Sequence, residues 1–201
     1  MDPIQGVERL ILSKGGDYLQ AHGLLNLDME TVNEFFEQVP QLFDKWHSET
    51  SSDYEGLLYR IYRPYSSKHL DMIDEWMGFE PRKWNSQVEF EVILMLNAIR
   101  YPDTMLLRSM DPSIEEELVR ISAYLHFVTH VYSIYDTSTL KGLAKLGIEI
   151  PETNKLDCFN YGAYVTSIEM LKELAPFTCF LEHDVPRQRL FQAALAQYGM
   201  E

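Results

Sequence analysis

Asp136 is the residue whose position in the sequence most suggests chemistry. It follows the aromatic-rich stretch 131–135 (VYSIY) and precedes the polar run 137–139 (TST). Aspartate in such a place commonly caps the first turn of a helix, because its carboxylate accepts hydrogen bonds from free backbone N–H groups. The same carboxylate could stabilise a developing positive charge or orient a water molecule. From the residues alone, the cap is the favoured interpretation.

His126 and His130 lie four residues apart, which places both imidazoles on one face of a helix. They could bind a metal ion if a carboxylate such as Asp136 completed the site, and a metal-dependent hydrolase would follow. The glutamate that follows the first histidine in zinc-protease helices is missing here, and no further ligand pattern lies downstream. We therefore favour core or capping histidines and expect no metal or other cofactor.

The stretch 59–68 (YRIYRPYSSK) combines cations with aromatic rings and contains no acid. Arg60, Arg63 and Lys68 could contact the backbone of a nucleic-acid strand while the tyrosines stack on its bases. The alternative is a pair of surface helices whose arginine stems cover core tyrosines. That alternative is the favoured interpretation of this stretch.

The charge balance limits which partners the whole surface can attract. In 201 residues, 17 Lys and Arg stand against 31 Asp and Glu, which gives a formal net charge of −14 and a pI of about 4.8. Such an excess of acid excludes a protein that coats nucleic acid or an anionic membrane with its entire surface. Any contact with nucleic acid must therefore be local and sensitive to salt.

The small number of cysteines and the short apolar runs predict a cytoplasmic protein without a membrane-spanning segment. Cys158 and Cys179 are too few for a disulfide framework, and they lack the spacing of zinc ligands. The start of the chain carries charges inside its only apolar run, unlike a secretory signal peptide. The longest apolar stretch, 92–99, is interrupted by Asn97 and is less than half of what a bilayer requires.

Apolar residues recur at helical spacing throughout the chain, so the sequence predicts an all-α fold. Start signals are Asp28, Asn85 or Ser86, Asp111 and Asp136, while Pro40 should interrupt the first helix and Gly78 should end another. The expected helices cover 28–39, 54–63, 67–77, 86–99, 112–130, 137–146, 159–174 and 185–197.

No linker or internal repeat divides the chain, so we expect one compact unit, with an N-terminal helical subdomain at 1–84 and the remainder at 85–201. The helix after Asn85 carries apolar residues on nearly all faces, from Val88 to Ile99. A helix of this kind is expected in the centre of a fold.

The stretch Ile121-Ser122-Ala123-Tyr124-Leu125-His126-Phe127, followed by Tyr132-Ser133-Ile134-Tyr135-Asp136-Thr137, resembles bacterial proteins of the helix-hairpin-helix DNA glycosylase superfamily. The most similar are the 8-oxoguanine DNA glycosylase-fold proteins, in which a Ser-Lys-Leu-Leu-His-Phe segment precedes a Pro-Ile-Tyr-Asp segment. The end of the chain, 189–199, is similar to the end of that group as well. The region of resemblance runs from Asn85 to Gly199.

The resemblance implies a helical domain of two lobes with a flipped base held in the cleft between them. Asp136 matches the aspartate that stabilises the oxocarbenium-like sugar or activates the attacking water in these enzymes. Tyr132, Tyr135 and His126 would then lie near the base pocket. The cations at 60, 63 and 68 would contact the nucleic-acid backbone.

Two departures from the family pattern bear on activity. The lysine that acts as Schiff-base nucleophile in bifunctional members falls on Ala123. The Leu-Pro-Gly-x-Gly hairpin that offers backbone amides to DNA phosphates is also missing, because the chain reads RSMDP at 108–112. Both departures fit a monofunctional N-glycosylase, and both also fit a relative that has lost catalysis.

Two functions from different classes therefore remain open. One is recognition or excision of a modified nucleobase in DNA or in a nucleoside, with Asp136 as the catalytic carboxylate. The other is a non-catalytic, acidic helical protein that binds a basic protein partner through its surface.

Overall fold

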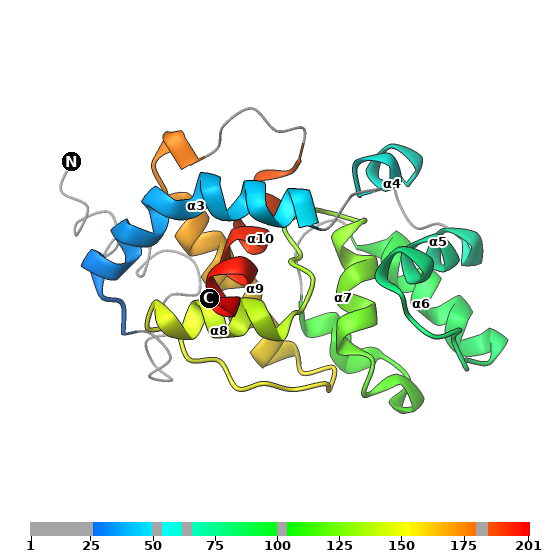
Figure 1. The fold of residues 1–201 in the computed structure, drawn as a ribbon. Coiled ribbons are helices and arrows are strands. Elements are labelled where there is room, and N and C mark those ends of the chain that lie inside the picture. The colour runs from blue at the N-terminus through cyan, green and yellow to red at the C-terminus, as the bar shows by residue number, and fades with distance from the viewer. Residues whose placement is uncertain (1–25, 50–53, 62–65, 100–103, 180–184) are drawn as a thin grey trace. The chain divides into compact units, whose positions relative to one another are not determined.

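The computed structural model of the chain describes residues 26–49, 54–61, 66–99, 104–179 and 185–201. Within these ranges the chain is mostly helical and has no β-strand, so the predicted all-α class is confirmed (Figure 1). The α-helices are α3 (Met29–Glu49), α4 (Tyr54–Arg60), α5 (Ser67–Met77), α6 (Ser86–Ala98), α7 (Leu118–His126), α8 (Thr137–Lys145), α9 (Cys158–Leu174) and α10 (Arg187–Met200). Short 3₁₀ helices are η1 (Thr104–Ser109), η2 (Pro112–Ile114) and η3 (Phe177–Cys179).

The chain folds into two compact units, each assembled from separate stretches of sequence. Unit 1 contains Met1–Ser51, Asp136–Glu152 and Ala163–Glu201, and unit 2 contains Ser52–Tyr135 and Thr153–Gly162. The region around Trp84, where the sequence suggests a subdomain boundary, lies inside unit 2.

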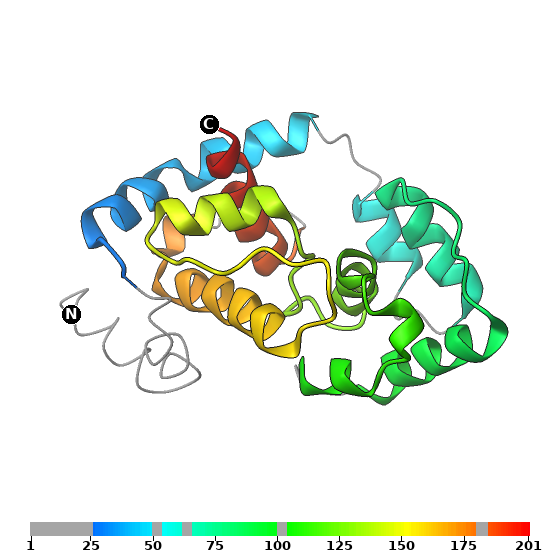
Figure 2. The ribbon, with the colours of Figure 1, turned by 90° about the horizontal axis from the view of Figure 1, so that it is seen from below.

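Unit 1 is built around α10, which lies among α3, α8 and α9 in both views (Figures 1 and 2). Two glycines let the backbones of α8 and α10 come into direct contact. A Cβ atom on Gly142 would lie 2.2 Å from the carbonyl oxygen of Leu195, and one on Gly199 would lie 2.0 Å from that of Ser138. Only glycine fits such a close approach.

Helix α3 runs without interruption through Pro40, so the expected break at this proline is wrong. The apolar face continues on both sides of Pro40, with Phe36 and Val39 before it and Phe43 after it, all buried. Because most helical stability in a protein comes from packing such a face, the loss of one backbone hydrogen bond at Pro40 is tolerated.

Unit 2 is held together by a buried charge cluster that links α5, α6 and α7. The guanidinium of Arg82 donates from Nη1 to Asp74 of α5 and from Nη2 to Glu89 Oε1 of α6, the latter at 3.1 Å. Tyr124 of α7 donates its hydroxyl to Asp74 Oδ1 at 2.6 Å, and Arg120 Nε lies 3.3 Å from the same oxygen. Asp74 is only 6% exposed, so its charge depends on these partners.

Two of the predicted helix boundaries in unit 2 are confirmed. Asn85 caps α6, because its Oδ1 accepts from the N–H groups of Gln87 (2.9 Å) and Val88 (3.0 Å). Helix α5 covers Ser67–Met77 as predicted and ends at Gly78, whose φ of 69° lies in the left-handed region that glycine adopts readily.

The helix expected to start at Asp111 begins later. Asp111 caps only the 3₁₀ helix η2, and α7 starts at Leu118. The N–H of Leu118 donates to the carbonyl of Asn154 at 3.1 Å, and the carbonyl of Glu115 accepts from the N–H of Leu156 at 2.7 Å. A continuous helix would need these groups for its own i to i−4 bonds, so the 154–156 segment prevents it.

The expectation that α6 lies in the centre of the fold is wrong. Its buried residues form a single stripe of Val88, Val92 and Leu96. Phe90 and Leu94 are 60% and 56% exposed. The helix therefore covers the core with one face and presents large apolar side chains outside it.

In the described part of the chain, no helix is both long enough and apolar enough to cross a membrane. Cys158 and Cys179 are buried and form no disulfide.

Candidate functional site

Asp136 caps α8, as the sequence predicts. Its carboxylate accepts from the N–H groups of Ser138 (3.1 Å) and Thr139 (3.3 Å), and also from the Thr139 hydroxyl (3.0 Å). The residue is half-buried. Both carboxylate oxygens are therefore engaged in holding the first turn of the helix.

A buried polar network lies beside Asp136 within unit 1. Burial, and then the charge of Asp136, raise the pKa of Tyr164 above its ordinary value. Gln192 Nε2 donates to the Tyr164 hydroxyl at 3.3 Å, and Arg189 Nη1 donates to Gln192 Oε1 at 3.0 Å. The Arg189 guanidinium also lies 4.9 Å from the centre of the Trp46 ring. These side chains could form hydrogen bonds with polar atoms of a ligand near the Asp136 cap.

The predicted base-pocket residues Tyr132, Tyr135 and His126 all lie in the interior of unit 2, with exposed fractions of 0%, 1% and 0%. Tyr132 stacks on Tyr161 with ring centres 6.4 Å apart and an interplanar angle of 10°. The Tyr135 hydroxyl accepts from the N–H of Thr153 at 2.9 Å. All three side chains are packed as core residues in this structure.

His126 uses both ring nitrogens for hydrogen bonds inside unit 2. Its Nδ1 lies 2.8 Å from the carbonyl oxygen of Tyr132, which can only accept, so Nδ1 carries the proton. In the neutral ring Nε2 then accepts from the Tyr54 hydroxyl at 2.6 Å. Among the residues that the structure describes, no three His, Cys, Asp or Glu side chains lie close enough to hold a metal ion.

The three cations predicted to contact a nucleic-acid backbone have different settings. Arg60 is exposed at the end of α4, and its Nε donates to the carbonyl of Gly56 at 3.2 Å. Lys68 is exposed in the first turn of α5. Arg63 lies outside the described residues.

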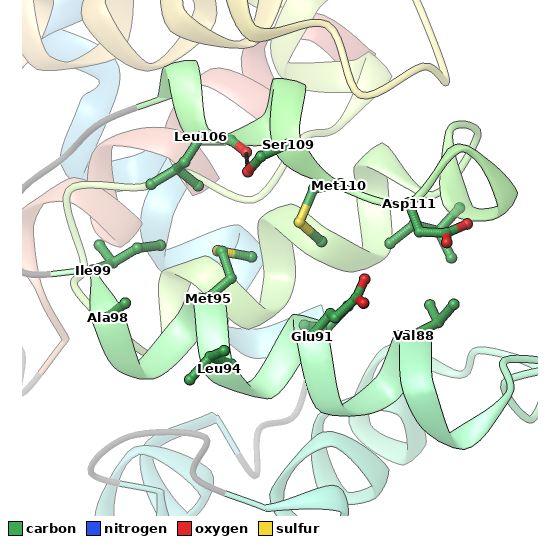
Figure 3. A pocket seen from close by; sticks show the side chains of 12 residues that line it. Val88, Glu91, Leu94, Met95, Ala98, Ile99, Leu106, Ser109, Met110 and Asp111 are labelled. Carbon is green, nitrogen blue, oxygen red and sulfur yellow. Dashed lines mark hydrogen bonds between the residues drawn. The ribbon is translucent and has the colours of Figure 1, made fainter.

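An open apolar groove that was not expected from the sequence runs along α6 in unit 2 (Figure 3). Its volume is about 670 Å³, within the size range of ligand and peptide sites. One wall is α6 and the other is formed by η1, η2 and the turn between them. The apolar lining includes Val92, Leu94, Met95, Ile99, Leu106 and Met110.

Two carboxylates give this groove its charge. Glu91 and Asp111 are the only charged residues among the twelve described residues that line it. The hydroxyl and then the N–H of Ser113 hold the pKa of Asp111 below its ordinary value, so Asp111 is ionised at neutral pH. The groove can therefore receive an apolar ligand that carries positive charge.

The feature that could have revealed the groove was the composition of α6 itself. A 13-residue helix with apolar side chains on nearly all faces needs apolar neighbours on more than one side. Sequence periodicity does not say whether this cover comes from the same chain or from a partner. We expected the same chain to cover α6, but the structure shows α6 with only one covered stripe.

Comparison with known proteins gives no significant match. No protein-family model and no curated protein matches the sequence, and no solved structure matches the fold.

Proposed function

We propose that this protein binds a helical segment of another protein in the groove along α6. The observation that carries the proposal is that Leu94 is 56% exposed at the edge of an apolar groove of about 670 Å³. Contiguous exposed apolar surface of this kind is typical of interaction sites. The protein would then act as a non-catalytic helical binding module.

The dimensions of the groove fit a short helix. From Val88 to Ile99 the wall formed by α6 is about 17 Å long at 1.5 Å per residue, which corresponds to about three helical turns. A helix of that length presents apolar side chains at i, i+3 or i+4, and i+7 to one face. Those side chains could contact Leu94, Met95 and Leu106.

A helix suits this groove better than an extended peptide. An extended peptide that docks by strand addition pairs its backbone N–H and C=O groups with a strand, and the described residues contain no strand. Buried in an apolar groove, its backbone groups would lose water without gaining partners. A helix satisfies these groups internally.

Selection from a displayed library of alanine-based helices of about 14 residues would test the proposal. Apolar and charged residues would be varied at the positions that face the groove, and the best binder would be synthesised and titrated by calorimetry. We expect binding to weaken about tenfold or more in Leu94→Asp, because a charge would then lie in the apolar contact.

Phe90→Asp is the matched control. Phe90 lies one turn away on the same helix and is 60% exposed, but it does not line the groove. Its substitution should change the affinity little. Loss of binding to the same extent in both variants, or the absence of any binder that depends on Leu94, would contradict the proposal.

The second candidate function is monofunctional base excision through Asp136, within the two-lobed glycosylase fold that the resemblance implies. The half-buried carboxylate and the network of Tyr164, Gln192 and Arg189 beside it support this candidate. Arg60, Arg63 and Lys68 would contact the backbone of the nucleic acid. A cytoplasmic setting suits both candidates.

Abasic-site formation on modified-base duplexes, single strands and nucleosides would test this second candidate. Asp136→Asn should abolish the activity while keeping the fold, because asparagine caps a helix as well as aspartate does. Absence of cleavage on every substrate, or equal cleavage by Asp136→Asn, would exclude it.

A further inference from the structure

The two acidic side chains of the groove lie toward one of its ends. Figure 3 shows Glu91 and Asp111 near Val88, while Ala98, Ile99 and Leu106 lie at the other end. The described lining of the groove therefore has an acidic end and an apolar end. This asymmetry bears on which segment binds and in which direction.

The negative charge at the acidic end is not neutralised within the part of the chain that the structure describes. Neither Glu91 nor Asp111 takes part in an ion pair there. The cation nearest to Asp111 in the sequence, Arg108, does not line the groove. It donates to Cys158 Sγ at 3.2 Å and lies 4.6 Å from the centre of the Phe159 ring.

Glu91 is held in place by its own helix. Its Oε1 accepts from Gln87 Nε2 at 2.7 Å, one turn earlier on α6. Figure 3 shows its side chain rising from α6 toward the wall that carries Met110 and Asp111. A cationic side chain placed between the two walls would be attracted by both carboxylates.

We propose that the bound segment is a basic amphipathic helix. Its lysine or arginine lies between Glu91 and Asp111, and its apolar side chains fill the remainder of the groove toward Ile99. The inference rests on the proposed function, and it adds the chemistry and the direction of the partner. The charged end selects the partner and sets its register, while the apolar end supplies most of the contact area.

The acidic residues of α6 disfavour a second copy that would occupy the groove through its own α6. Helix α6 has no lysine or arginine, and it carries Glu89 and Glu91. Two copies that met through their α6 helices would bring these acids toward one another, in a chain whose net charge is already −14. The groove thus favours a partner of the opposite charge.

The library selection described above tests the inference through the composition of its binders. We expect lysine or arginine to be enriched at one end of the apolar face, and the affinity to fall as salt is raised. Glu91→Gln and Asp111→Asn should each weaken binding of the synthesised peptide about three- to fivefold, because each removes one partly exposed charge pair. Both substitutions keep the shape of the side chain, and asparagine still caps η2.

Glu116→Gln is the matched control, because Glu116 is exposed and does not line the groove. It should leave the affinity unchanged. A peptide with glutamate in place of its basic residue should bind Glu91→Lys better than it binds the unchanged protein. This reversal would show direct contact instead of a general effect of net charge.

The outcomes separate the inference from the proposed function. Binders that depend on Leu94 but lack basic residues, or that respond equally to Glu91→Gln and Glu116→Gln, overturn the inference and leave groove binding intact. The absence of any binder that depends on Leu94 overturns both. Self-association that Leu94→Asp abolishes would replace the basic partner with a second copy.

Discussion

Helices α6 and α10 have apolar residues on several faces, yet their environments differ. In α10 the buried residues follow one another without a gap from Leu190 to Gln197, and even the polar Gln192 is only 1% exposed. In α6, which is richer in large apolar side chains, Phe90 and Leu94 are more than half exposed. Hydrophobicity therefore does not predict which of the two helices lies inside.

The difference comes from the neighbours of each helix. Gly142 and Gly199 let α8 contact the backbone of α10, and the aromatic face of α3 covers another side, with the Phe35 and Phe191 ring centres 5.5 Å apart. Helix α6 has its core neighbours along the stripe of Val88, Val92 and Leu96. We infer that α10 uses its apolar surface for folding and that α6 keeps part of its own for a partner.

The largest expected effect is a loss of stability when a leucine of α10 is truncated, compared with almost no loss for a leucine of α6. Leu195 is fully buried in α10, so Leu195→Ala should lower the free energy of unfolding by about 3 kcal/mol. Leu94→Ala should change it by less than about 0.5 kcal/mol, because the side chain is already largely in water. Urea denaturation of both variants measures the difference, and equal losses would contradict the comparison.

The contact between α8 and α10 should be the next most sensitive feature. Gly142→Ala places a Cβ atom 2.2 Å from the backbone oxygen of Leu195, so the two helices must separate, at a cost of about 2 kcal/mol. Gly162→Ala is the control, because the added Cβ would meet the Thr104 side chain, which can rotate, at 2.9 Å. Thermal unfolding should show a clear loss of stability only in Gly142→Ala.

Much of the helical framework could be predicted from the sequence, because the signals are local. Asn85 and Asp136 cap their helices through side-chain contacts within three residues, and Gly78 ends α5 through its own backbone conformation. These features depend on neighbours in the sequence. They can therefore be predicted without knowledge of any tertiary contact.

The errors at Asp111 and in α6 arose from contacts that are distant in sequence. Asp111 has every mark of a helix start, but Asn154 and Leu156 take the backbone groups that the next turn would need. The groove along α6 also depends on η1 and η2, and the spacing of apolar residues in the sequence does not predict where these short helices lie. The sequence could thus indicate that α6 needs cover, but it could not predict the groove that separate elements form, whereas the Asp136 cap could be predicted.

Removing a cap should have an intermediate effect on both units. Asp136→Ala leaves the N–H groups of Ser138 and Thr139 without their acceptor and should cost about 1 kcal/mol. Asn85→Ala should cost a similar amount at the start of α6, whereas Asp136→Asn should cost only a few tenths of a kcal/mol, roughly within the spread of good capping residues. Chemical denaturation gives the losses, and a large loss in Asp136→Asn would assign the carboxylate a structural role beyond capping.

The smallest expected effect concerns the titration of Asp111, which supplies half of the charge in the groove beside α6. Hydrogen bonds from the side chain and then the N–H of Ser113, the latter at 2.8 Å, hold the pKa of Asp111 below its ordinary value. Because the folded state has the lower pKa, the stabilising contribution is complete above the unfolded-state pKa of about 3.9 and is lost as the pH falls through the folded-state value.

Ser113→Ala keeps the backbone donor and removes the hydroxyl, so it should raise the pKa of Asp111 only part of the way toward its ordinary value. NMR titration of the side-chain carboxyl carbon measures both values. An Asp111 that titrates at or above its ordinary pKa in the unchanged protein would contradict the structure at this point. The expected result means that the groove beside α6 keeps the charge of Asp111 throughout the neutral range. Helix α6 therefore borders an open, charged surface, whereas Leu195 of α10 is fully buried.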